Sequence, residues 1–175
     1  MFALAQLAVP DWYLFVVAFS FGTIIGSFLN VYIYRFHTGK SLSGHSHCLS
    51  CATLLQWFEL IPLLSYLGLR GRCRTCGCKI PVRYFLVELL TATVFTLSVT
   101  IATFLTELLI LWCIMGVLVV ITVYDYYHYI IPDSLTVFLS GAVACLWGVW
   151  LYFGFESVES LLWALGATIG GATFF

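Results

Sequence analysis

Four cysteines in one polar stretch form two pairs that could hold a metal ion. Cys48 and Cys51 make one Cys-x-x-Cys pair, Cys73 and Cys76 make a second, and 21 residues separate the pairs. Two pairs at about this spacing can bring four thiolates around a tetrahedral zinc ion. Because such a site has no open coordination position, we expect a structural zinc that folds this stretch. The alternatives are two coincidental motifs or a redox pair.

Cys78 is a fifth thiol beside the second pair and could compete as a ligand. We prefer Cys76, because the Cys-x-x-Cys spacing lets two sulfurs face one ion and Gly77 can adopt the backbone conformation that a tight turn requires. Nearby basic residues favour thiolate forms and offset the charge of a four-thiolate site; these are Arg72, Arg74 and Lys79. Three histidines match no familiar metal site and are interpreted as solvated loop residues: His37, His45 and His47.

Asp125 is the acid that could carry catalysis. It follows an apolar run, at the end of a predicted helix where the dipole disfavours a carboxylate by about 0.3 to 1 kcal/mol. Acids in or near a membrane are functional hypotheses by default. We therefore favour a functional role over that of an interfacial anchor in a belt of aromatic residues, which would comprise Tyr126, Tyr127 and Tyr129.

Two other polar residues in this segment have simpler interpretations. Asp133 follows Pro132 and precedes an apolar run, so we expect it to be a helix N-cap. His128 lies among tyrosines, and we interpret it as a solvated residue rather than a proton carrier.

The composition predicts that membrane helices position these residues. Hydrophobic residues make up 62% of the 175 positions and charged residues 9%, and the mean hydropathy is +1.06, outside the range of soluble domains. Four apolar runs are long enough to cross a bilayer: residues 12–34, 84–105, 108–124 and 134–153. A fifth run begins at Leu161 and reaches Phe175 after 15 residues, about 22 Å as a helix. We therefore expect the sequence to be a fragment of a longer protein.

The charge distribution predicts the orientation. All seven basic residues lie in residues 35–83, where Glu59 is the one acid, so this stretch carries +6 and the remainder carries -7. Basic residues stay on the cytoplasmic side, which places this loop and residues 125–133 inside and the N-terminus outside. An apolar segment in the loop, residues 54–69, is expected to lie against the membrane face or to form a packed core.

The expected fold is all-α: a polytopic membrane helical bundle with four full spans, a partial fifth, and a small cytoplasmic zinc-binding loop. Residues 1–34 would form the outer N-terminus and first span, residues 35–83 the zinc-binding loop, and residues 84–175 an incomplete transmembrane region.

Several motifs resemble, in order, those of the type IV prepilin peptidases, which are bacterial inner-membrane aspartic proteases and often also N-methyltransferases. They are GSFLNVYIYR (residues 26–35), the first cysteine pair, IPLLSY (61–66), RGRC (70–73) and RYFLVEL (83–89). Asp125 with the Ile-Pro-Asp at residues 131–133 resembles the first catalytic motif of that family.

The resemblance implies cleavage of the basic leader of pilin-like precursors by two aspartates, with Asp125 as the first. The family takes the second from a GxGD motif that does not occur in residues 1–175. We therefore expect the complete protein to be a peptidase and residues 1–175 alone to lack proteolytic activity. Residues 84–175 would then be the incomplete peptidase region.

The resemblance also implies S-adenosylmethionine as a methyl donor for the cysteine-bearing half, with unknown binding residues. Glu88 matches a family position and is a candidate for a role in methyl transfer. The alternative is a hydrogen-bonded structural acid near Arg83. The implied partners are type IV prepilins or secretion pseudopilins and the lipid bilayer, with no nucleic acid. The rival functions are an inactive zinc-stabilised scaffold for pilus or type II secretion assembly, and methyl transfer alone.

Overall fold

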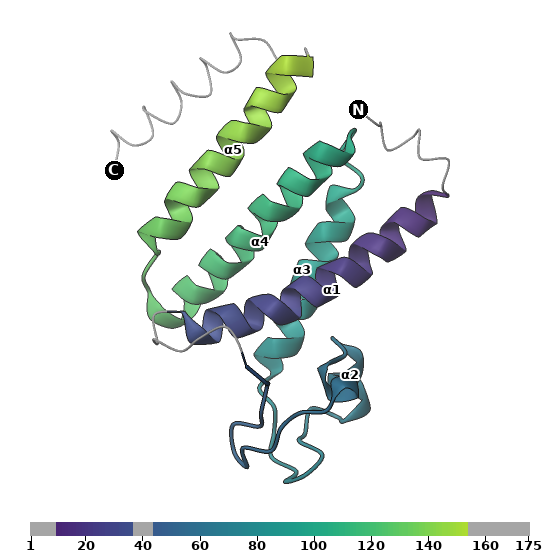
Figure 1. The fold of residues 1–175 in the computed structure, drawn as a ribbon, viewed down its shortest axis with the longest axis vertical. Helices are drawn as coiled ribbons and strands as arrows, with labels where there is room; N and C mark the ends of the chain where they lie inside the picture. Colours follow the sequence, from purple (N-terminus) through teal and green to yellow (C-terminus); the bar gives the residue numbers. More distant parts are fainter. Residues whose placement is uncertain (1–9, 37–43, 154–175) are drawn as a thin grey trace.

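The computed structural model describes residues 10–36 and 44–153, which form helices and turns without a named strand. The long helices are α1 (Asp11–Arg35), α3 (Val82–Ser98), α4 (Leu105–His128) and α5 (Asp133–Phe153). Between α1 and α3 lies a small lobe with a 3-10 turn, η2 (Trp57–Leu60), and a short helix, α2 (Leu64–Gly68). Figure 1 shows this lobe at one end of the bundle, with α1 crossing α3 and α5 beside α4.

Among the residues that the structure describes, three helices are long and apolar enough to cross a membrane: Trp12–Arg35, Leu105–His128 and Asp133–Phe153. The predicted all-α membrane bundle is thereby confirmed. The helix α3 has 17 residues, about 25 Å at 1.5 Å per residue, so it is shorter than the other three. The predicted fifth run, from Leu161, lies outside the described residues.

The predicted boundary between the second and third spans was wrong. The run expected over residues 84–105 stops at Ser98, and α4 begins at Leu105 rather than at residue 108. The cause is local: a Glu107 carboxylate oxygen accepts hydrogen bonds from the backbone N–H groups of Thr103, at 2.7 Å, and Phe104, at 3.4 Å. Donors at a helix N-terminus need such acceptors. Glu107 therefore lies in the first turn of α4, not in the connecting turn.

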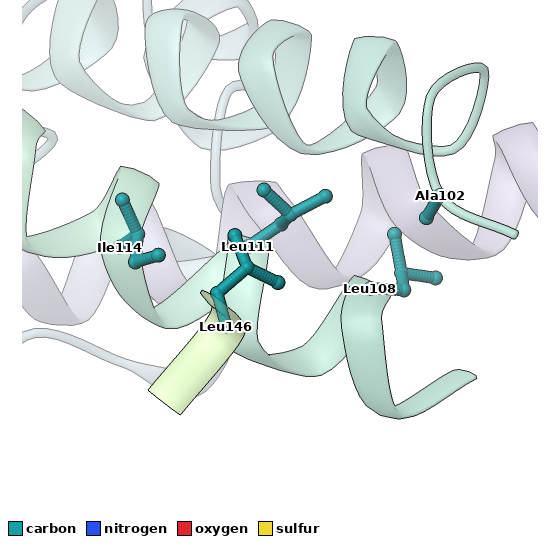
Figure 2. Close-up of a cluster of buried hydrophobic side chains, with 5 residues drawn as sticks. All are labelled: Ala102, Leu108, Leu111, Ile114 and Leu146. Carbon is teal, nitrogen blue, oxygen red and sulfur yellow. The ribbon is translucent and has the colours of Figure 1, made fainter. Parts of the chain in front are cut away.

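Aromatic and aliphatic side chains fill the space between the helices. The Phe95 and Trp112 rings stack with centroids 5.2 Å apart, and the Trp112 indole N–H donates to Ser98 Oγ at 2.9 Å. Figure 2 shows a second cluster, where α4 and the turn before it meet α5; it comprises Ala102, Leu108, Leu111, Ile114 and Leu146. These contacts fix α4 against both of its neighbours.

Two glycines let α1 approach α3 closely. A Cβ atom added at Gly22 would lie 2.6 Å from Ala92 Cα, and one at Gly26 would lie 2.8 Å from Glu88 Cα. Both distances are too short for a real contact, and small residues four apart are a common feature of membrane helix pairs. The crossing of α1 and α3 therefore requires glycine at both positions.

We predict that Gly22→Ala lowers the free energy of unfolding by about 1 to 3 kcal/mol, the usual cost of overpacking. The new methyl group would force the α1 and α3 backbones apart, because its nearest neighbour is the main chain of Ala92. Gly116→Ala is the matched control, since an added Cβ there meets no heavy atom within 4 Å. Unfolding of both variants in detergent measures the difference. Equal stability of the two would show that the close crossing is not required.

The lobe exposes much of its apolar surface. Leu63 is buried, but Trp57 is 75% exposed and Leu64 67% exposed. Other large apolar residues of this segment are also exposed: Leu54, Phe58, Leu60, Ile61 and Leu67. Of the two expectations for residues 54–69, this pattern favours a segment that lies on a membrane face over a packed core.

Candidate functional site

The first cysteine pair lies in a tight knuckle. The Cys48 backbone N–H donates to the Thr53 carbonyl at 2.9 Å, and the Ala52 N–H donates to the Cys48 carbonyl at 2.9 Å. Ala52 has φ of 56°, a left-handed conformation that non-glycine residues rarely adopt. These bonds close a tight turn that contains Cys48 and Cys51.

The second pair repeats the same knuckle. The Cys73 N–H donates to the Cys78 carbonyl at 2.9 Å, and the Gly77 N–H donates to the Cys73 carbonyl at 2.9 Å. Gly77 takes the left-handed position with φ of 71°, where glycine has no steric penalty. Each knuckle thus contains one Cys-x-x-Cys pair, and Cys78 takes the place that Thr53 has in the first knuckle.

The two knuckles bring their sulfurs together. The Sγ atoms of four cysteines lie within 4.8 Å of one another: Cys48, Cys73, Cys76 and Cys78. Cys48 Sγ is 3.9 Å from Cys76 Sγ and 3.5 Å from Cys78 Sγ. Four sulfurs about 2.3 Å from a tetrahedral zinc ion are about 3.8 Å apart, so the spacing suits zinc. The donor set, thiolates alone, is also the set expected of a structural zinc site.

Cys51 differs from the other sequence-predicted ligands because it has an oxygen partner. Its Sγ lies 3.3 Å from the Thr53 hydroxyl, and hydrogen bonds from the Thr53 side chain and backbone lower the pKa of Cys51 to about 6. A thiol with this pKa is largely thiolate at neutral pH, the form that binds metals. The ligand set Cys48, Cys51, Cys73 and Cys76 therefore stays a prediction, with Cys78 as the competing thiol.

The cations around the thiols have different environments. Arg74 Nε lies 3.5 Å from a Glu59 carboxylate oxygen, and its guanidinium carbon is 5.1 Å from the centre of the Phe58 ring. Arg72 and Lys79 are exposed. Arg74 thus links the second knuckle to η2, which leaves Arg72 and Lys79 to offset thiolate charge.

A buried carboxylate joins the lobe to the bundle. Glu88 of α3 is 9% exposed, and its Oε2 accepts a hydrogen bond from the Leu63 backbone N–H at 2.8 Å. Leu63 has φ of 58°, so this N–H comes from a strained turn at the start of α2. The geometry matches the structural alternative for Glu88, with the Leu63 N–H and the Ser27 side chain as its hydrogen-bond partners.

We predict that Glu88→Ala loosens the lobe, because it leaves the buried Leu63 N–H without an acceptor, at a cost of about 1 to 3 kcal/mol. Glu88→Gln is the control, since its amide oxygen can accept the same hydrogen bond. Limited proteolysis of the lobe reads out the effect. If the alanine and glutamine variants are cut at the wild-type rate, Glu88 does not hold the lobe.

Asp125 lies in the last turn of α4. Its backbone carbonyl accepts a hydrogen bond from the Tyr129 N–H at 2.7 Å, and Tyr129 ends the helix with φ of 54°. Asp125 is half-buried, and within residues 10–36 and 44–153 no side chain pairs with its carboxylate.

The other polar residues of this segment have modest roles. Asp133 is the first residue of α5, not the N-cap expected from the sequence. Its carboxylate is near the positive end of the helix dipole, a favourable place for an acid. His128 is exposed, and its ring centre is 4.4 Å from that of Tyr124. Of the predicted loop histidines, His45 and His47 are exposed, while His37 lies outside the described residues.

Apolar helices with a thiol-rich lobe at one end define a polytopic membrane protein with a candidate metal centre. Comparison with known proteins refines this class. Residues 20–102 match the bacterial peptidase A24 N-terminal domain. No solved structure matches the chain significantly.

Several curated relatives are similar over most of the chain and are named prepilin leader peptidase/N-methyltransferase. The Myxococcus xanthus protein is 40% identical over 162 residues, 91% of this chain and 46% of the relative. The Aeromonas hydrophila protein is 37% identical over 173 residues, 81% of this chain and 55% of the relative. A type 4 prepilin-like proteins leader peptide-processing enzyme from Escherichia coli O78:H11 is 34% identical over 180 residues, 85% of this chain and 66% of the relative.

The chain belongs to the type IV prepilin peptidase family, as its motifs indicated. It spans about half the length of the curated relatives that it matches.

Proposed function

We propose that this protein is a prepilin leader peptidase that removes the basic leader of type IV pilin-like precursors at the cytoplasmic membrane face. The names of the relatives support this activity. The observation that carries the proposal is the position of Asp125, a carboxylate without a side-chain partner in the described structure, at the lobe end of an apolar helix.

Aromatic contacts place the ends of three helices together around this position. The Phe36 ring, just after α1, is 5.2 Å from the Tyr124 ring of α4. The Arg83 guanidinium, at the start of α3, is 5.4 Å from the centre of the Tyr127 ring. The basic lobe follows α1 and precedes α3, so Asp125 and the lobe share one end of the bundle (Figure 1).

Peptide cleavage by this protein would use a pair of carboxylates. Two neighbouring carboxyl groups share one proton, because their pKa values are pushed apart. The ionised member removes a proton from water as the water oxygen attacks the scissile carbonyl carbon, and the protonated member donates to the carbonyl oxygen. The first carboxyl group, which now carries the water proton, gives it to the amine as the C–N bond breaks, and the second carboxylate regains its proton from the tetrahedral hydroxyl as the new carboxyl group forms. Asp125 supplies one carboxylate, and the second would come from a GxGD motif absent from residues 1–175.

The thiol lobe would hold a structural zinc ion through two cysteine pairs, Cys48 with Cys51 and Cys73 with Cys76. When bound, zinc would fix the two knuckles to each other. In this proposal zinc takes no part in peptide cleavage. The names of the relatives also support N-methylation of the new N-terminus, with S-adenosylmethionine as the donor. No residue of this chain is assigned to binding that donor.

The proposed location is the bacterial inner membrane, with the N-terminus outside and the lobe in the cytoplasm. The supporting observation is charge: the described basic residues all lie in the lobe or at the helix ends beside it. A leader rich in basic residues also remains on the cytoplasmic side. Substrate leader, lobe and Asp125 would thus share one aqueous compartment.

Cleavage of a purified prepilin by the protein from its complete reading frame tests the proposal. A zinc-stabilised scaffold for pilus or type II secretion assembly would leave the prepilin intact. Methyl transfer alone would leave it intact but label a pre-cleaved pilin from radiolabelled S-adenosylmethionine. Residues 1–175 alone are expected not to cleave.

A further inference from the structure

A cavity of about 330 Å³ opens where α1 and α4 end and α3 begins. It is partly polar, and its principal lining residues are Asn30, Tyr34, Arg83, Tyr84, Tyr127 and His128. No acidic residue lines it, and Asp125 is not among its lining residues. The cavity is therefore distinct from the proposed peptidase carboxylate, although both lie at the same end of α4.

Arg83 is fixed in this cavity by aromatic rings. Its guanidinium carbon lies 5.1 Å from the Tyr84 ring centre and 5.4 Å from the Tyr127 ring centre, and Nη2 is 3.4 Å from the Tyr84 hydroxyl oxygen. Rings hold a guanidinium without neutralising it. In the described part of the chain no carboxylate pairs with Arg83. A half-buried cation thus remains available for an anion.

A hydrogen bond between two helices fixes the cavity wall beside Arg83. The Asn30 side-chain amide donates to the Tyr84 carbonyl at 3.0 Å, which joins α1 to α3 at the cavity wall. Guanidinium groups bind phosphate through paired hydrogen bonds. A cavity of this size, with aromatic walls and few polar groups, is in the range that holds small ligand groups.

An exposed apolar stripe leads away from Arg83 along α3. Leu86, Leu90 and Leu97 follow Arg83 at helical spacing on one side of the helix, and they are 54%, 44% and 58% exposed. A phosphate in the cavity could therefore belong to a molecule whose apolar part lies on this stripe. This arrangement favours a membrane lipid over a free phosphate.

We propose that this cavity binds the phosphate of an anionic phospholipid headgroup, with Arg83 as the anchoring cation and the acyl chains against α3. Basic pockets between transmembrane helices on the cytoplasmic side are typical lipid headgroup sites. The proposal does not depend on the peptidase activity.

The test uses the full protein in detergent, titrated with phosphatidylglycerol, with phosphatidylcholine and with inorganic phosphate while native mass spectrometry counts bound lipid. Phosphatidylglycerol should bind, and Arg83→Gln should weaken it at least about tenfold. Arg70→Gln, which removes the same charge from an exposed position of the lobe, should leave binding unchanged. Equal binding by the Arg83→Gln variant, or equal weakening by both substitutions, overturns the proposal.

Two further measurements test the lipid assignment: competition with inorganic phosphate and photocrosslinking of a lipid. Inorganic phosphate that binds as well as the lipid and resists displacement by it overturns the lipid assignment. If Arg83→Gln does not fold, a photoreactive phosphatidylglycerol is crosslinked to the wild-type protein. Crosslinks at Tyr34 or Tyr127 support the site, and crosslinks confined to α5 overturn it.

Discussion

Asp125→Asn, in the protein from its complete reading frame, is expected to lower the rate of prepilin leader cleavage by at least about a hundredfold. An amide can neither take a proton from water nor share one with a second carboxylate. Folding should be preserved, because the described structure gives the Asp125 carboxylate no side-chain partner to lose. The measurement is the initial rate of leader removal from a purified prepilin, with the melting temperature as a check of fold.

Asp133→Asn is the matched control, because it removes a carboxylate eight residues along the same segment. The only loss expected there is a small dipole contribution at the start of α5, so its rate should stay close to that of the wild type. Cleavage by the Asp125→Asn variant at the wild-type rate would remove Asp125 from the mechanism.

Cys73→Ser is expected to abolish stoichiometric zinc binding and to unfold the lobe. Cys73 is 7% exposed, and its backbone makes both hydrogen bonds of the second knuckle. A water molecule could therefore take the place of its thiolate at the zinc ion only if the turn opened. A structural zinc site contributes its binding energy to folding, on the order of 10 kcal/mol in small zinc domains. Elemental analysis for zinc and limited proteolysis of the lobe are the two measurements.

Cys113→Ser is the control, because Cys113 is an exposed thiol on α4, outside the lobe. That variant should keep about one zinc per chain, as a single four-thiolate site requires. A wild-type protein that contains no zinc, and whose lobe resists proteolysis equally with and without a chelator, would show that the thiols serve another purpose.

A comparison of Cys51→Ser with Cys78→Ser identifies the fourth ligand. The repeated knuckle favours Cys51, whereas the sulfur distances in the structure favour Cys78. The variant with the larger loss of zinc affinity marks the ligand. Equal small losses would mean that the two thiols can replace each other.

Patterns within short segments predicted much of this molecule. Uninterrupted apolar runs predicted the long helices, since a bilayer imposes a minimum length. The Cys-x-x-Cys spacing indicated a thiol cluster, and the short gap from Cys76 identified Cys78 as a competitor; the structure brings Cys78 into the group with Cys48, Cys73 and Cys76, while Cys51 stays a predicted ligand. Apolar runs and cysteine spacing predict these features because each feature is formed by residues that are close together in the sequence.

Contacts between distant segments were not predicted. The hydrogen bond from Leu63 to Glu88 joins residues 25 positions apart, and the strained turn at Leu63 has no local signal. The break between α3 and α4 was missed for a different, local reason: the Thr103 and Phe104 N–H groups donate to Glu107, which fixes the start of α4 at Leu105. Hydropathy does not detect such a break, because residues 99–104 are themselves mostly apolar.

The cavity at Arg83 also had no linear signature. Its walls come from three helices, and the arginine appeared in the sequence only as one of seven basic residues that set orientation. Its position between two tyrosine rings is a property of the packed helices. Only the structure distinguishes the half-buried Arg83 from exposed cations such as Arg72.

Lysine labelling from each side of the membrane tests the central claim, that the thiol lobe and Asp125 face the cytoplasm. Lys40 and Lys79 are the two lysines of the chain, and both belong to the basic loop; Lys79 is exposed. A membrane-impermeant amine reagent, with modified peptides identified by mass spectrometry, should label Lys79 in inside-out vesicles and leave it unmodified in intact spheroplasts. Labelling of Lys79 in intact spheroplasts would contradict the account, because Asp125 would then lie on the wrong side of the membrane for a cytoplasmic leader.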